Sequence, residues 1–137
     1  MPSSTSIYIG FDVGLARTGV AVANSLNRSA RVAGSVVVNN GRHDWQAVDA
    51  LIAEREPEAV ILGNGSQHDP SLTKAINRLK SHLEQQHKLK VHLVDEALST
   101  VNANRAMVDE DVGRSKRKSL RDQFAACIIL ESWLNSR

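Results

Sequence analysis

The feature that most constrains the fold is a short apolar run that ends in glycine, EAVILG at residues 58–63. Such a run is typical of a strand buried on both faces, as in parallel sheets covered by helices. Apolar residues recur at helical spacing on both sides of it: Trp45, Val48, Leu51 and Ile52 before it, and Leu72, Ile76, Leu79 and Leu83 after it. This alternation of strand and helix predicts the α/β class.

The remaining patterns extend this alternation over the whole chain. The predicted strands are residues 7–12, 18–23, 34–38, 58–63 and 91–94. The predicted helices run from Trp45 to the stop at Pro57, from the cap Asp69-Pro70 onward, from Ser99 or Thr100 to about Val108, and from about Leu120 to Leu134. The turn signal at residues 39–41 is expected to lead directly into the first helix. We therefore predict a mixed five-stranded sheet flanked by helices, in one domain over residues 1–137.

Composition narrows the class of protein without naming its function. The 137 residues, 42% of them hydrophobic, suffice for one sizeable core. No apolar run is long enough to span a membrane and the first residues have no signal-peptide pattern, so we expect a soluble, cytoplasmic protein. The single cysteine, Cys127, lies in an apolar run and is expected in the core. A net charge of +2 does not by itself indicate a polyanionic partner.

Three acidic residues fall at places where an α/β sheet gathers ligands. Asp12 ends the first predicted strand, Glu96 follows the fifth, and Asp122 lies near the start of the last predicted helix. Ligands collect outside the carboxyl ends of strands in open sheets, so these carboxylates can share one rim. Three carboxylates there repel one another unless a cation neutralises them, and oxygen ligands suit Mg²⁺ or Mn²⁺. A pair of such ions is the usual device for phosphoryl displacement by water.

Structural explanations for the same acids stay open at this point. An Asp after a strand can cap a turn, and an Asp in the first turn of a helix is favoured by its dipole without any function. Asp95 and Glu96 point to opposite faces, and we favour Glu96 for its reach. If strand 58–63 lies between strands 7–12 and 91–94, Asp12 and Glu96 start roughly 9.6 Å apart, a gap that ions and long side chains must close.

Several residues near these acids are candidates for contacts with nucleic acid. Gly14 permits a close backbone approach to phosphate, although hairpin glycines do the same without a ligand. Arg17 is suited to bidentate phosphate binding, with a solvated surface role as the alternative. A basic cluster precedes Asp122 and is expected to be mobile and to follow a nucleic-acid backbone: Arg114, Lys116, Arg117 and Lys118.

The histidines carry no motif. His82, His87 and His92 show no metal-ligand spacing, and we expect no role for them. His68 lies in the loop after the predicted strand 58–63, but we expect it to take no part in proton transfer.

Four segments carry a family resemblance: residues 10–14 (GFDVG), 17–22 (RTGVAV), 94–101 (VDEALSTV), and Asp122 followed by residues 125–132 (AACIILES). In this order and at these separations, the sequence resembles the YqgF (RuvX) family of ribonuclease H-like proteins over nearly its whole length. The first segment alone is weak, because sugar kinases and actin-like ATPases open similarly. Two departures from the family pattern are Ala97 in place of Arg and Gly63-Asn64-Gly65 in place of Gly-Leu-Pro.

The resemblance implies a ribonuclease H-like fold and a nuclease of the Holliday-junction-resolvase superfamily, with two Mg²⁺ or Mn²⁺ ions. By motif matching, Asp12, Glu96 and Asp122 take the three acidic catalytic and metal-binding positions. The implied substrate is structured RNA, specifically the 5′ end of precursor 16S rRNA in ribosome biogenesis. Two alternatives remain: a resolvase of branched DNA that acts as a homodimer, and a nucleic-acid binding module without catalysis.

Overall fold

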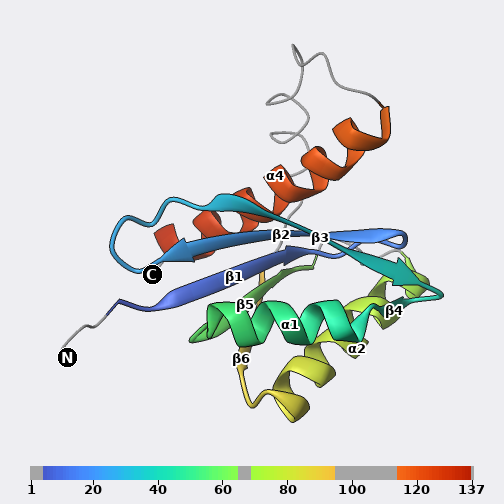
Figure 1. Ribbon diagram of the computed structural model, residues 1–137, viewed down its shortest axis with the longest axis horizontal. Coiled ribbons are helices and arrows are strands. Elements are labelled where there is room, and N and C mark those ends of the chain that lie inside the picture. Colours follow the sequence, from blue (N-terminus) through green and yellow to red (C-terminus); the bar gives the residue numbers. More distant parts are fainter. Residues whose placement is uncertain (1–4, 65–68, 95–113, 137) are drawn as a thin grey trace.

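Among the residues that the structure describes, a six-stranded sheet lies between one long helix on one face and two helices on the other (Figure 1). The computed structural model describes residues 5–64, 69–94 and 114–136, and for residues 114–119 it describes the backbone alone. The strands are β1 Ile7–Asp12, β2 Arg17–Asn24, β3 Arg31–Asn39, β4 Arg42–His43, β5 Ala59–Gly63 and β6 Lys90–Val94. The helices are α1 Trp45–Arg55, α2 Pro70–Gln86 and α4 Arg114–Asn135.

The sheet is mixed, as predicted, but it has six strands and not five. Its order is β4-β3-β2-β1-β5-β6, with β5 and β6 parallel to β1 and the other neighbours antiparallel. The additional strand is β4, because the turn at residues 39–41 folds the chain back onto Val38 and Asn39 before α1 begins. Gly41 adopts φ +76° in this turn, a conformation that glycine takes without strain. A strand of two residues is too short to leave a period in the sequence.

Local capping explains where α1 and α2 begin. Asp69 is the N-cap of α2, its carboxylate accepting hydrogen bonds from the backbone amides of Ser71 and Leu72, and Pro70 occupies the first turn, as predicted. Asp44 caps α1 in the same way through the amide of Ala47. Helix α1 ends just before Pro57, again as predicted.

The sheet separates two apolar cores. Alternate residues of β1 enter each of them: Ile9 and Phe11 pack beneath α1 and α2, whereas Tyr8 packs beneath α4. The two cores also share β5, whose five residues are all buried, as the apolar run predicted. Cys127 lies buried in the α4 core, which confirms its predicted place.

Helix α4 begins earlier than predicted. The prediction of a start near Leu120 was wrong, because the helix already includes Arg114 and the basic residues after it. Lys and Arg are good helix formers, so a charged segment can extend a helix that packing stabilises further along. The predicted helix from Ser99 or Thr100 to Val108 lies outside the described residues. None of the described helices is long and apolar enough to cross a membrane.

A candidate metal centre at the carboxyl edge of the sheet

Asp12 is the last residue of β1 and lies on the face of the sheet that α4 covers. Tyr8 and Gly10 precede it at alternate positions, and both meet α4: Tyr8 belongs to the α4 core, and a Cβ at Gly10 would lie 2.9 Å from the Cβ of Leu130. Side chains two apart in a strand share a face. Asp12 is half-buried at this edge.

A glycine in β2 brings Asp122 to the same place. Gly19 is the direct partner of Asp12 in the antiparallel pair, so the two positions share a face. A Cβ built at Gly19 would overlap the backbone carbonyl oxygen of Asp122. Only glycine therefore lets α4 cross β2 this closely. The crossing sets the backbone of Asp122 over Gly19, which lies one strand spacing of about 4.8 Å from Asp12.

Polar contacts further along α4 hold the helix in this position. Gln123 accepts a hydrogen bond from the amide of Gly34 in β3 at 3.1 Å. Glu131 accepts one from the amide of Ala30 at 2.8 Å. These bonds tie α4 to the chain around β3, on the far side of β2 from β1. These hydrogen bonds help to hold α4, and with it Asp122, against the sheet.

The capping explanation for Asp122 does not apply. Because α4 begins at Arg114, Asp122 lies in its third turn, beyond the first turn where backbone amides and the helix dipole favour an acid. Its carboxylate instead meets Arg17, with Nε of Arg17 3.3 Å from Oδ2 of Asp122. This Nε is buried and has no hydrogen-bond partner among the described residues, so the contact is an ion pair without hydrogen-bond geometry. The arginine offsets the charge of an acid that has no capping role.

Gly14 has a structural explanation that its motif did not reveal. A Cβ at this position would overlap the backbone carbonyl oxygen of Arg17 across the β1–β2 turn. Glycine is therefore required by the turn itself, whether or not a phosphate approaches it. The predicted role of Gly14 in nucleic-acid binding stays a prediction.

The third acid, Glu96, lies outside the described residues. The structure does place the strand before it: β6 ends at Val94, which packs in the α4 core at the level of Gly63. Because β5 lies between β1 and β6, the ends of β1 and β6 are two strand spacings apart, as expected. The glycine between them, Gly63, contributes no side chain to that space.

The remaining predicted site residues fall in regions described in part or not at all. The first turns of α4, of which the structure describes the backbone, contain the predicted basic residues Arg114, Lys116, Arg117 and Lys118. These residues precede Asp122 along the helix. His68 lies outside the described residues. Asp12 and Asp122 offer carboxylate oxygens, the type of donor that a hard divalent cation such as Mg²⁺ or Mn²⁺ prefers.

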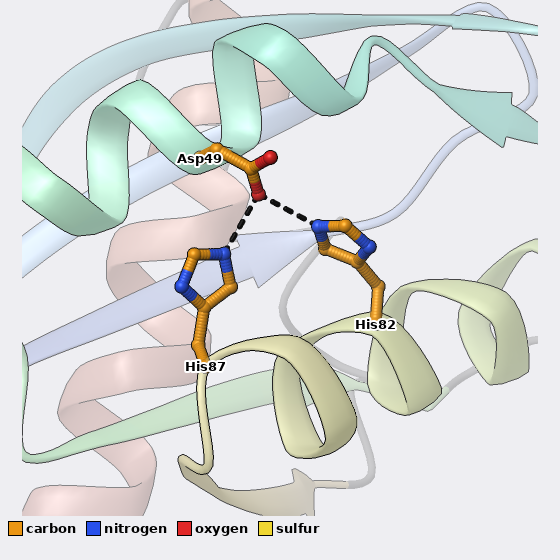
Figure 2. Close-up of side chains that lie close together, drawn as sticks. All are labelled: Asp49, His82 and His87. Carbon is orange, nitrogen blue, oxygen red and sulfur yellow. Dashed lines mark hydrogen bonds and ion pairs between the residues drawn. The ribbon is translucent and has the colours of Figure 1, made fainter.

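A second polar cluster, which the sequence did not predict, lies on the opposite face of the sheet. Asp49 extends from α1 toward His82 and His87, which come from the end of α2 (Figure 2). One carboxylate oxygen, Oδ1, lies 2.7 Å from Nε2 of each histidine. Hydrogen bonds from His82 and His87 lower the pKa of Asp49. The histidine spacing gave no signal because the third member comes from another helix.

A buried histidine lies next to this cluster. His43, in β4, is 3% exposed and its Nε2 lies 2.7 Å from Oγ1 of the buried Thr18. Burial lowers the pKa of His43 to about 4, and the nearby His82 adds to the effect. His43 is therefore neutral at physiological pH.

Comparison with known proteins agrees with this architecture. The RuvX family model, described as Holliday junction resolvase, matches residues 6–136. A Legionella pneumophila (strain Lens) protein provisionally named pre-16S rRNA nuclease is 38% identical, over 93% of this chain and 94% of its own. A Nitrosococcus oceani protein of the same name is 35% identical, over 99% of this chain and 91% of its own.

Two solved structures are similar in fold. The fowlpox virus Holliday junction resolvase superposes with a TM-score of 0.62 at 16% identity, covering 96% of this chain and 99% of that one. Thermus thermophilus RuvC in complex with a Holliday junction gives a TM-score of 0.58 at 13% identity, covering 96% of this chain and 95% of that one. At these identities the likeness concerns the fold, which is ribonuclease H-like.

Proposed function

This chain belongs to the RuvX family, and on that premise we propose that it is a divalent-metal-dependent nuclease that hydrolyses phosphodiester bonds in nucleic acid. The observation that carries the proposal is the contact between Gly19 and Asp122. The backbone of Asp122 lies over Gly19, and Gly19 is the direct strand partner of Asp12, which supports a shared site for these two acids that are remote in sequence. Acidic side chains at one edge repel one another, and bound cations would relieve this repulsion, as the ion pair of Arg17 with Asp122 already does in part, which supports a metal site here.

In this proposal, Asp12 and Asp122 hold Mg²⁺ or Mn²⁺ together with Glu96. Two such ions, when bound, supply an activated water and stabilise the leaving oxygen. The carboxylates would hold the ions, and because the ions would supply the activated water, no nucleophilic side chain is required. Arg17, whose Nε lies 3.3 Å from Oδ2 of Asp122, would contact a phosphate oxygen of the substrate. Gly14 and the basic turn of α4 (Arg114, Lys116, Arg117 and Lys118) would contact the nucleic-acid backbone without reading its sequence.

The substrate we propose is structured RNA, at the 5′ end of precursor 16S rRNA, in the cytoplasm. Its support is the name of the curated relatives, which match this chain over nearly their whole length. A second candidate is a branched DNA junction, favoured by the likeness to RuvC bound to such a junction. A resolvase cuts two strands symmetrically and needs a two-fold dimer, so a chain that stays monomeric on DNA counts against it.

Cleavage of precursor 16S rRNA in Mg²⁺ tests the proposal. We expect Asp12→Asn and Asp122→Asn to lower the rate by about 10³-fold or more, because each removes a ligand worth several kcal/mol in the transition state. Glu84→Gln is the matched control: it removes one exposed carboxylate of α2 that pairs with Lys80, and it should cleave like the wild type. Unchanged cleavage by Asp12→Asn would defeat the mechanism. RNA binding without any binding of Mg²⁺ or Mn²⁺ would instead identify a module without catalysis.

A further inference from the structure

Three side chains on the face opposite α4 meet through a single oxygen atom. Asp49 Oδ1 lies 2.7 Å from Nε2 of His82 and 2.7 Å from Nε2 of His87, and all three atoms lie within 4.8 Å of one another (Figure 2). We propose that Asp49, His82 and His87 form a binding site for a transition-metal ion of the Zn²⁺ type, separate from the acidic edge of the sheet.

The donor atoms select the kind of ion. Two imidazole nitrogens and one carboxylate oxygen are a common protein ligand set for Zn²⁺, with water in the fourth position. Mg²⁺ prefers oxygen ligands and keeps much of its water, so it competes poorly here. The acidic edge has the opposite preference. The two sites therefore discriminate between ions.

The distances require little rearrangement. Ligand atoms around a tetrahedral Zn²⁺ are about 3.3 Å apart when each bond is about 2.05 Å. Each N···O distance therefore has to lengthen from 2.7 Å to about 3.3 Å, and the two imidazole nitrogens, which lie within 4.8 Å of each other, have to reach about the same separation. Rotations within the three side chains can supply shifts of this size.

The surrounding residues hold the ligands on a rigid frame. The ring of Trp45 stacks on His82 with centroids 4.3 Å apart and planes 20° apart, which limits the rotation of that imidazole. Along α2, the buried Leu79 and Leu83 lie on either side of His82 in the sequence and anchor the helix in the core. Sites built on packed helices of this kind keep their geometry better than sites on loops.

Solvent reaches all three side chains of the site. The side chains of His82 and His87 are 17% and 21% exposed, and that of Asp49 is 48% exposed. An open pocket of 470 Å³ borders the cluster, with Trp45, His82 and Gln86 among its lining. An ion can enter here, and water can complete its coordination. Once bound, it would link α1 to α2, and the unfolded chain lacks this arrangement.

Calorimetric titration of the tag-free full chain with Zn²⁺, in excess Mg²⁺, tests the site. The Mg²⁺ occupies oxygen-only sites, and Cys127 does not compete because it is buried in the α4 core. We expect one Zn²⁺ per chain and a rise in Tm on binding. His87→Gln should weaken binding by about 100-fold or more, since even indirect partners of a metal are worth 10–100-fold. His87 caps the end of α2, so its replacement leaves the core intact.

His92→Gln provides the matched control, because His92 lies against Trp133 on the α4 face and not in the cluster. This variant should bind Zn²⁺ like the wild type. The site is refuted if the wild type binds no Zn²⁺ in excess Mg²⁺, or if His87→Gln and His92→Gln bind it equally well. In either case the cluster is a hydrogen-bonded link between α1 and α2. Cleavage of RNA in Mg²⁺ does not depend on this outcome.

Discussion

The acidic edge beneath α4 and the histidine cluster between α1 and α2 lie on opposite faces of one sheet, and they are assembled in different ways. At the acidic edge, contact between two backbones sets Asp122 over Gly19, the strand partner of Asp12. In the cluster, side chains from two helices meet at one oxygen of Asp49. The first site depends on how closely a helix approaches a strand, and the second on how two helices pack side by side. A different kind of substitution should therefore disrupt each site.

The largest effect is expected from Gly19→Ala, which should disrupt the acidic edge and leave the histidine cluster intact. The added methyl overlaps the carbonyl oxygen of Asp122, so α4 must move, at a cost of about 3 kcal/mol in unfolding free energy. Cleavage should fall by about 100-fold or more as Asp122 leaves its place, while Zn²⁺ binding to the cluster persists. Urea unfolding, the cleavage assay and calorimetry measure the three quantities.

Ser71→Thr is the control for Gly19→Ala. It adds one methyl group at an exposed position of α2 and should change stability by less than about 0.5 kcal/mol. If Gly19→Ala is as stable and active as this control, the close crossing does not define the acidic edge.

The next effect is a dependence of the unfolding free energy on pH, and it comes from His43, which lies next to the histidine cluster. Burial lowers the pKa of His43 from 6.5 to about 4, so between these values the unfolded chain binds a proton that the folded chain does not. The stabilisation is complete above pH 6.5 and is lost as the pH falls toward 4, by about 3 kcal/mol in total. Urea unfolding at a series of pH values should show this slope in the wild type and a shallower one in His43→Gln. Parallel curves for the two proteins would contradict it.

The smallest effect is expected at Arg17. Arg17→Gln removes the ion pair with Asp122 and the proposed phosphate contact, so KM for RNA should rise about tenfold, equivalent to about 1.4 kcal/mol. The affinity for Mg²⁺ should not fall, because the arginine competes with the cation for Asp122. Arg55→Gln, which removes an exposed guanidinium on α1, should leave KM unchanged. A lower Mg²⁺ affinity in Arg17→Gln would mean that Arg17 mainly orients the acid.

The same contrast explains how much the sequence could predict. Strand 59–63 and the cap Asp69-Pro70 are local features, written in consecutive residues, and both were predicted. The acids Asp12 and Asp122 were found through local motifs, although the contact at Gly19 that joins them is tertiary. Whether they bind metal with Glu96 stays a prediction.

The features that the sequence missed depend on distant partners. Strand β4 forms by pairing with Val38 and Asn39, and its two residues are too few to show the alternation of polar and apolar residues that marks a strand. The early start of α4 lies in charged residues without an apolar stripe. The histidine cluster needs Asp49, which is more than thirty residues away from either histidine. In each case tertiary packing determines the structure, and contacts between distant residues leave no local pattern in the sequence.

The crossing at Gly19 also bears on how the acidic edge would respond to its ions. Because the main chains of α4 and β2 are already in contact there, this half of the site is preorganised. Arrival of a cation then has little conformational entropy to overcome at Asp12 and Asp122. Amide exchange in β1 and β2 should therefore be nearly the same with and without Mg²⁺.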